Sequence, residues 1–458
     1  MKKRIIILFV LIITAFDVYM LFIRNNNKEA EYHDAEKPTY ATDDTYCNQE
    51  DVKERAKCLF TIDRIPRVDI STKKALDLTY QVWNKDITVS IDNKKIGNAK
   101  IKTRGNTTYQ AATIYGAYNY KLKFDEDVNI FGFGSNKKWV LLPNFIDRSY
   151  FRQFYFSNLG QLIMGDYFSP EMKYIELYIN NQYKGLYLLS ESIEEDENRL
   201  EGSDFIVQLE QGRLWRLERG SDKDYFQIDD KSLSCNINAK DPDVKPVNTM
   251  YTLEYPDSFK EAGEEKTNNI KSSINDLINN ARESKSLDSL DLNSAVNFYM
   301  FDELFYNSGF GSSSVYLYKL KDYRIILGPL WDFDQLGLSN SNSGFNRPPT
   351  CDNNLYRYLL TNSVFRKRLK EKLIWYKENL ADYSIDVIEE LRNNKVLRDA
   401  VYRNEQLYHT WGNPMKDLSV WQNSGIVKLK DWDEHLDFIE NFMNGRADWI
   451  LNHYGSLY

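Results

Sequence analysis

The stretch YRIILGPLWDFDQLGLS, residues 323–339, places Asp332 and Asp334 directly after an apolar run with the character of a buried strand. Taking a carboxylate out of water is costly unless a cation or hydrogen bonds compensate. If residues 330–334 stay extended, side chains alternate, so the two aspartates share one face and Phe333 takes the other. Paired carboxylates suit a hard divalent cation such as Mg²⁺, and the stretch therefore predicts a metal site. The competing interpretation is that one aspartate caps the next turn and the other is solvated.

Upstream of this stretch, alternation of apolar and polar residues predicts strands from about residue 68. Polar pairs between alternating runs predict hairpin turns at Asp92-Asn93, Asn180-Asn181 and Lys321-Asp322. One helix is predicted early in the chain, over residues 147–165, with Asp147 as its N-cap and Gly165 beyond its end. The N-terminal part of the chain is therefore expected to be rich in strands.

After about residue 262 the pattern becomes helical. Apolar residues recur at three- and four-residue spacing in the segments 266–284, 291–307, 364–380 and 433–454. Strands followed by helices predict a two-lobed α+β protein rather than alternating βαβ units. We expect a domain over residues 68–455, with a strand-rich N-terminal lobe at about 68–215 and a mainly helical C-terminal lobe at about 262–455.

Composition argues against several classes of function. The net charge is −8, and no basic stripe with interleaved aromatic residues occurs, so we expect no nucleic-acid partner. None of the four histidines lies in a ligand-spaced pair, which disfavours a histidine zinc site or a Ser–His triad. The four cysteines permit two disulfides in three pairings, and Cys47 and Cys58 flank a short helical segment and are able to close a small loop.

The N-terminus carries a targeting signal. After MKKR, residues 5–23 form a mostly apolar run that is long enough to cross a bilayer as one helix. No small-residue cleavage site follows it, so we predict an uncleaved signal anchor at 1–24 and a polar spacer and lead-in at 25–67. The leading positive charges favour an inner N-terminus, which makes this a single-pass membrane protein with an extracytoplasmic body. The alternative is an atypical cleaved signal peptide.

Two further segments have features that phosphate binding requires. KTRGNTTYQ (102–110) is predicted to be a polar loop after a strand, and YNYKLKFD (118–125) places Lys121 and Lys123 on one side of a later strand. Phosphates are bound by point charges together with backbone N–H donors. Each feature alone is common on protein surfaces, where a strand lysine is usually only solvated.

Several motifs together resemble one known family. In chain order they are IKTRGNTTY (101–109), YKLKF (120–124), KKWVLLPNFIDRSYFRQ (137–153), IELYINNQYKGLYLLSE (175–191), SSSVYLYK (312–319) and GPLWDFD (328–334). This series is similar to that of the spore-coat protein H (CotH) kinase family, and FIENFMNGRADWI (438–450) resembles the family's closing helix. The resemblance implies an atypical protein-kinase-like fold that binds ATP with Mg²⁺ or Mn²⁺ and phosphorylates Ser or Thr of surface or spore-coat proteins.

The resemblance also implies roles for individual residues. Asp332 is the implied metal-binding aspartate, with Asp334 as a second metal ligand. The residues implied to bind or surround the nucleotide are Lys123 as the phosphate-contacting lysine, Arg104 and Asn106 in the covering loop, Glu176 orienting the lysine or the metal, and Arg152, which is either structural or in contact with phosphate.

One position departs from the family pattern. Members usually carry an aspartate in the loop before the Y-L-Y strand, and the aligned residue here is Gly309. Asp302 and Glu303, on the preceding predicted helix, are the available substitutes for a catalytic carboxylate. Two hypotheses follow: a membrane-anchored kinase, or a catalytically impaired pseudokinase that acts as a scaffold for coat or surface assembly.

Overall fold

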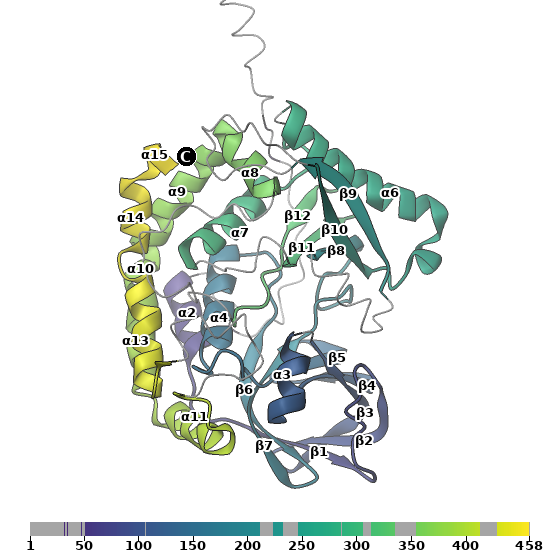
Figure 1. Ribbon diagram of the computed structural model, residues 1–458, viewed down its shortest axis with the longest axis vertical. Coiled ribbons are helices and arrows are strands. Elements are labelled where there is room, and N and C mark those ends of the chain that lie inside the picture. The colour runs from purple at the N-terminus through teal and green to yellow at the C-terminus, as the bar shows by residue number, and fades with distance from the viewer. Residues whose placement is uncertain are drawn as a thin grey trace, which may run out of the picture.

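The chain is described by a computed structural model over residues 51–105, 107–210, 223–231, 246–284, 286–305, 313–334, 354–412 and 428–457, with Tyr32, Asp34 and Cys47. Two sheets and a set of helices make up these residues, which confirms a mixed α+β protein (Figure 1). One sheet is closed into a barrel, and the other is open and lies beside the long helix α6.

The barrel contains β1 (Arg67–Thr72), β2 (Asn84–Ile91), β3 (Lys94–Arg104), β4 (Asn119–Asn129), β5 (Ser135–Leu142), β6 (Met172–Ile179) and β7 (Gln182–Glu191). Its strand order is β1-β2-β3-β4-β5-β7-β6, and parallel pairing of β1 with β6 closes it. Inward-facing residues such as Ile101, Leu122 and Trp139 fill the interior. Because the barrel is closed, it has no unpaired edge strand, and outward-facing side chains of its strands form its outer surface.

The predicted hairpin turns within the barrel are confirmed. Asp92 and Asn93 join β2 to β3 with φ of 48° and 66°, and Asn180 and Asn181 join β6 to β7 with φ of 49° and 63°. Two successive residues at positive φ give the turn twist that matches antiparallel strands, and Asn and Asp adopt it more readily than most residues.

The second sheet has the order β12-β11-β8-β10-β9. Its strands are β8 (Ser203–Glu210), β9 (Tyr225–Lys231), β10 (Pro246–Tyr255), β11 (Ser313–Leu320) and β12 (Ile325–Leu327). The predicted hairpin of β11 and β12 is confirmed, with Leu317 opposite Leu327. The sequence groups residues 205–210 with the N-terminal strands, but β8 pairs with β10 and β11 instead. The boundary near 215 therefore does not separate the two sheets.

The helices are α2 (Val52–Phe60), α3 (Thr107–Tyr115), α4 (Arg152–Met164), α6 (Phe259–Asn279) with the π-helical turn η1 (Asn280–Ser284), α7 (Leu292–Phe305), α8 (Asn354–Thr361), α9 (Ser363–Asn379), α10 (Ala381–Arg392), α11 (Lys395–Tyr408), α13 (Trp432–Met443), α14 (Arg446–Asn452) and α15 (Tyr454–Leu457). They include all the helical segments predicted after residue 262. The C-terminal helices α9 to α14 line one side of the molecule (Figure 1).

Helix α4 is the central element of the main core. All thirteen of its residues are buried, and it packs against α2, α7 and β6. It begins at Arg152, later than the sequence predicted, because residues 147–151 form a turn before it. The N-cap residue is Phe151 and not Asp147 as predicted, although Asp147 Oδ2 accepts hydrogen bonds from the N–H groups of Phe151 (3.0 Å) and Arg152 (2.8 Å). Gly165, with φ of 69°, ends the helix as expected.

Residues before the barrel attach to this core. A disulfide joins Cys47 to Cys58 on α2, which confirms the small loop. Cys235 and Cys351 lie outside the described residues. Within the described ranges no helix is long and apolar enough to span a membrane, and the predicted anchor at 5–23 lies outside those ranges.

Candidate functional site

The segment after β12 brings two carboxylates together, although not in the way the sequence predicted. Residues 328–334 are not a strand, and Asp332 has a left-handed φ of 73°. The extended conformation from which a shared face of the two aspartates would follow is therefore not adopted, because the chain turns at the first aspartate. The two carboxylates are nevertheless neighbours, since the charge of Asp332 raises the pKa of Asp334.

Side chains from two other elements hold this segment in place. Ser314 on β11 donates a hydrogen bond of 2.9 Å to Asp332 Oδ2. The backbone N–H of Phe333 donates to Gln153 Oε1 on α4 at 2.8 Å. Phe333 itself is buried and packs edge-on against Phe301 of α7. The aspartates are thus fixed relative to the sheet and to the central helix.

Asp334 is buried in a strongly acidic surrounding. Burial raises its pKa well above the usual value, the negative charges of Asp332 and Asp147 raise it further, and Arg152 opposes them. Among the described residues its Oδ1 atom has no hydrogen-bond partner. A buried carboxylate oxygen without a partner is uncommon in proteins and is the kind of atom that a bound cation satisfies. The residues present therefore fit a divalent cation beside Asp332 and Asp334.

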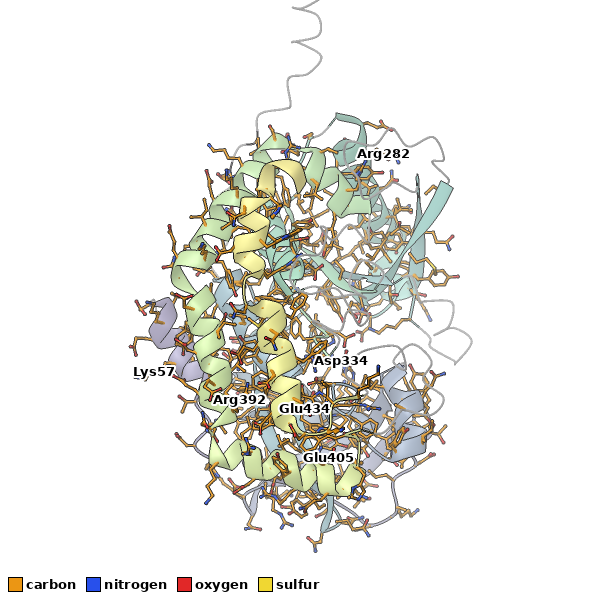
Figure 2. The ribbon with its side chains drawn as sticks, turned by 60° about the vertical axis from the view of Figure 1, so that its left-hand side comes forward. Lys57, Arg282, Asp334, Arg392, Glu405 and Glu434 are labelled. Atoms are coloured by element: carbon orange, nitrogen blue, oxygen red, sulfur yellow. A yellow bond between two sulfur atoms is a disulfide. The ribbon has the colours of Figure 1, made fainter. Side chains whose placement is uncertain are left out.

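Arg152 is buried next to this site, where its charge acts on Asp334. Its Nη1 atom lies 2.6 Å from Asp147 Oδ1, and neither side chain is exposed. The sequence left open whether Arg152 is structural or contacts phosphate, and its complete burial favours the structural role. Asp334 lies between the second sheet and the barrel (Figure 2).

The outer face of the barrel carries a row of basic side chains, and one end of this row lies beside the segment. Outward-facing residues of β3 and β4 alternate in register, with Lys102 opposite Lys121 and Lys100 opposite Lys123. At the end of β3, the Arg104 guanidinium lies 5.6 Å from the centre of the Trp331 ring, directly before Asp332. The end of β3 that carries Arg104 is therefore the part of this basic surface adjacent to the two aspartates.

Lys121 is the lysine of β4 that lies closer to this end. Arg104 is opposite Asn119, so at roughly 3.3 Å per residue Lys121 lies about 7 Å along the strand from that level and Lys123 about 13 Å. Burial lowers the pKa of Lys121 to about 8, and the carboxylate of Glu194 partly offsets that effect. Glu194 also pairs with Arg199 and, at 2.5 Å, with Lys138 of β5. A connected set of charges thus surrounds Lys121.

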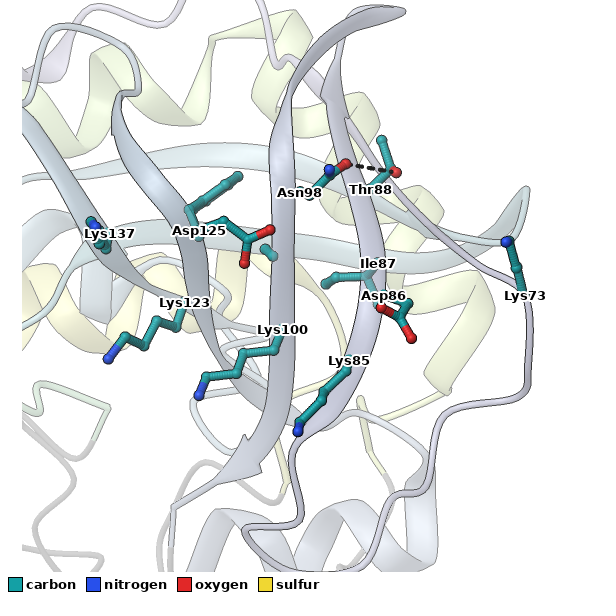
Figure 3. Close-up of a pocket in the computed structure, with 12 residues that line it drawn as sticks. Lys73, Lys85, Asp86, Ile87, Thr88, Asn98, Lys100, Lys123, Asp125 and Lys137 are labelled. Carbon is teal, nitrogen blue, oxygen red and sulfur yellow. Dashed lines mark hydrogen bonds between the residues drawn. The ribbon is translucent and has the colours of Figure 1, made fainter.

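Lys123 lies elsewhere. Its side chain lines a hollow on the outer face of β2, β3 and β4, together with Lys85 and Lys100 (Figure 3). The lining of this hollow includes neither Lys121 nor the two aspartates. The lysine for which the resemblance implied a phosphate contact thus lies in this hollow, and Lys121 lies nearer to Arg104 along β4.

Glu176 does not approach either lysine. Its Oε1 atom accepts hydrogen bonds from Arg403 of α11, at 3.0 Å from Nε and 2.5 Å from Nη2. In the barrel β6 is separated from β4 by β5 and β7, so at about 4.8 Å per strand the two strands are roughly 14 Å apart. The first of the two roles implied for Glu176, orienting Lys123, does not fit this position, and its carboxylate joins the barrel to a C-terminal helix; its other implied role, orienting the metal, stays a prediction.

Asp302 and Glu303 are both fully buried in α7. Tyr356 donates a 2.6 Å hydrogen bond to Asp302, and Arg446 of α14 pairs with Glu303 at 2.7 Å. A carboxylate with no exposed surface does not reach the hydroxyl of a protein substrate, so these contacts do not support the substitute catalytic role. Asn106 and Gly309, which also entered the sequence prediction, lie outside the described residues.

The loop expected at 102–110 is partly helical. The strand continues to Arg104, and α3 begins at Thr107. Gly105, at φ of 90°, makes the turn between them, and an added Cβ there would lie 1.9 Å from Thr108 Oγ1. Only glycine fits this position, so the Gly in the motif has a steric reason.

Sequence reasoning missed four residues that shape the site. Asp147 was read only as a helix cap, and Gln153, Ser314 and Glu194 were not singled out. Their contacts join positions far apart in the chain. The one sequence signal for them was that Asp147, Gln153 and Ser314 lie within the motifs quoted above. In the described ranges no three His, Cys, Asp or Glu side chains form a metal-binding group. Mg²⁺ commonly uses only one or two carboxylates and takes its remaining ligands from water and phosphate.

Comparison with protein families decides the relationship of the chain. A family model described as CotH kinase protein matches residues 101–450, which is most of the chain. The chain belongs to the CotH kinase family. The matched region runs from β3 to α14 and so includes Arg104, Lys121 and the two aspartates of the candidate site, Asp332 and Asp334. No match was found among curated protein sequences.

Proposed function

We propose that this CotH family member is a protein kinase that transfers the γ-phosphate of ATP to Ser or Thr of surface or spore-coat proteins. The observation that carries the proposal is the approach of Arg104, on the barrel, to the segment that bears Asp332 and Asp334. At this junction between the barrel and the 328–334 segment, a cation that suits phosphates therefore lies beside carboxylates that suit a divalent metal. The barrel and the helix-rich remainder then act as two lobes, with the nucleotide between them.

In this proposal Asp332 and Asp334 hold Mg²⁺ or Mn²⁺. A divalent cation held by these two carboxylates would supply positive charge for the phosphates during transfer. Asp332 is kept in position by Ser314, and Asp334 supplies the buried Oδ1 that lacks a hydrogen-bond partner among the described residues. The buried ion pair of Arg152 and Asp147 keeps the start of α4 rigid next to the two aspartates.

Lys121 and Arg104 contact the phosphates. The lowered pKa of Lys121 leaves its ammonium largely charged at neutral pH, as phosphate binding requires. Glu194 and Arg199 act as positioning residues, because their charges surround the lysine without reaching the nucleotide. Lys123 lies farther along β4 and is not part of this contact.

The acceptor hydroxyl loses a proton during transfer, and Gly309 supplies no carboxylate for it. Phosphoryl transfer depends mainly on positioning and electrostatic stabilisation, so a missing base lowers the rate without abolishing the reaction. The same position motivates the second candidate, a pseudokinase that binds nucleotide and assembles coat or surface proteins. The apolar run at 5–23 supports anchoring of either form in the membrane with the body outside the cytoplasm.

The test uses the purified full chain with Mg²⁺ or Mn²⁺, and compares wild type with Asp332→Ala and with Asp257→Ala, an exposed aspartate in the loop before α6. We measure stabilisation by ATP and transfer of labelled γ-phosphate to Ser/Thr-containing proteins. Stabilisation and transfer that only Asp332→Ala loses support the kinase. Stabilisation without transfer in wild type supports the pseudokinase. Absence of ATP stabilisation with both metals contradicts the kinase and a nucleotide-binding pseudokinase, and leaves only a kinase-shaped scaffold.

A further inference from the structure

A second basic surface lies outside the proposed nucleotide site. The hollow on the outer face of the barrel has a volume of about 680 Å³. Its charged lining consists of Lys73, Lys85, Lys100, Lys123, Lys137, Asp86 and Asp125. We call this surface the lysine hollow. Lys85, Lys100 and Lys123 extend in the same direction from the neighbouring strands β2, β3 and β4 (Figure 3).

The lysines of this hollow have few internal partners. Throughout the described part of the chain, none of the five ammonium groups forms an ion pair with a carboxylate. Lys100 lies 4.7 Å from the centre of the Trp83 ring, a cation–π contact that involves no carboxylate. Five cations against two aspartates leave the hollow with a positive potential, and concave surfaces strengthen such a potential.

From this geometry we infer that the lysine hollow binds an anionic polypeptide segment, one that carries several carboxylate or phosphoryl groups. Neighbouring strands are about 4.8 Å apart, so three parallel lysines present a row of charges that one anionic group does not satisfy. An extended peptide displays alternate side chains on one face every 6 to 7 Å or so, and several of these reach the row together.

Other polyanions fit less well. The aromatic side chain in the lining, Phe124, is buried and offers no ring face on which a base could stack, which disfavours single-stranded nucleic acid. A concave surface also receives a chain segment better than it meets a flat lipid surface. Lys100 and Lys123 follow Lys102 and Lys121 directly in the register of β3 and β4, so a segment bound here extends towards the proposed nucleotide site.

The inference rests on the proposed function only where it makes this segment part of the kinase substrate. Binding itself needs neither nucleotide nor transfer. We therefore measure it first without ATP, by fluorescence anisotropy of labelled peptides on the full chain. The probes are a glutamate-rich peptide, a matched peptide with phosphoserines and a neutral glutamine peptide, each at low and at physiological ionic strength.

The test variant is Lys85→Glu with Lys100→Glu, which leaves Lys123 in place. The matched control is Lys94→Glu with Lys95→Glu, which makes the same change in charge at the exposed start of β3. We expect both anionic peptides to bind wild type, the test variant to lose affinity roughly tenfold or more, and the control to lose little. If the test variant melts early, Lys73→Glu with Lys137→Glu is used in its place.

Tighter binding of the phosphoserine peptide identifies phosphorylated segments as the source of the anion, and equal binding identifies acidic segments in general. Equal losses in the test and control variants overturn the inference, as does absence of binding at low ionic strength. Competition by Mg-ATP, or loss of binding in Asp332→Ala, places the anion in the nucleotide site and also overturns it. Failure of ATP to bind affects only the proposed function.

Discussion

Arg152 and Asp147 form an ion pair of 2.6 Å from which water is excluded entirely. The pair lies at the start of α4, where Asp147 also accepts a hydrogen bond from the N–H of Arg152, and both charges influence Asp334. Helix start, ion pair and candidate metal site are therefore one connected structure. This connection explains why a charged motif occurs at the beginning of a completely buried helix.

Arg152→Ala is expected to destabilise the fold by roughly 3–5 kcal/mol, because it leaves Asp147 charged, buried and without its partner. Chemical denaturation measures this change. The control is Arg64→Ala, which removes an exposed pair with Asp92 of similar length and is expected to cost at most about 1 kcal/mol. Similar losses in the two variants would show that burial of the Arg152 pair does not matter.

Asp334→Asn separates metal binding from folding. Burial and nearby negative charge already favour the uncharged carboxyl, so we expect the amide to change the free energy of unfolding by less than about 1 kcal/mol at neutral pH. Metal binding needs the carboxylate, so stabilisation by Mg-ATP, roughly 2.7 kcal/mol at 100 times the dissociation constant, should be largely lost. A variant that folds and keeps full Mg-ATP stabilisation would exclude Asp334 as a ligand.

Lys121 predicts a pH dependence for nucleotide binding. Its pKa is lowered to about 8 in the free protein, so the ammonium is lost as the pH rises above that value. Affinity for Mg-ATP is expected to fall by up to about tenfold per pH unit above 8, until the pKa of the bound state is reached. Lys121→Arg keeps a charge at all these pH values and should remove the fall.

The corresponding change at Lys123 provides the comparison. Lys123→Arg should retain the wild-type decline, because Lys123 lies outside the proposed phosphate contact. Isothermal titration between pH 7 and 9.5 measures all three proteins. A decline that disappears in Lys123→Arg and persists in Lys121→Arg would return the role to the residue that the sequence favoured.

Glu191 predicts how stability changes with pH. It is buried at the end of β7, accepts a hydrogen bond of 3.0 Å from the Glu171 N–H and lies 3.5 Å from Arg199 Nε. Burial raises its pKa to about 7 from an ordinary value of 4.5. The folded state therefore binds this proton more tightly, and the resulting stabilisation is complete below about pH 4.5 and is lost as the pH rises to 7.

We therefore expect the free energy of unfolding of wild type, measured relative to Glu191→Gln, to fall by on the order of 2–3 kcal/mol between pH 5 and 8. Urea denaturation at several pH values provides the curves. Glu126→Gln, a change of an exposed carboxylate on β4, is the control and should give a curve parallel to wild type. Parallel curves for Glu191→Gln would show that its carboxyl is not perturbed by burial.

Local features of this protein were predictable from sequence where the physical cause is itself local. The turns at Asp92-Asn93 and Asn180-Asn181 follow from the tolerance of these residues for positive φ. Gly165 ends α4 for the same reason, and amphipathic spacing identified the helices after residue 262. The motif series also indicated the family correctly, since it depends on residue identity and order alone.

Positions that depend on long-range pairing were not predictable in this way. Parallel pairing of β1 with β6 closes the barrel, and β8 joins β10 and β11 across a large separation in sequence. Alternation shows that a segment is a strand but not which strand lies beside it. Alternation likewise gives no sign that Glu176 pairs with Arg403 of α11.

The sequence by itself determined that this is an α+β member of the CotH family, with paired aspartates at the end of a buried hairpin. Only the tertiary structure decided which charges lie near them: Arg104 lies beside Trp331, Arg152 is buried next to Asp334, and Lys123 lines a separate hollow. The reason is physical. Residue type determines what a side chain is able to bind, whereas strand pairing determines where it points and burial determines whether it is charged.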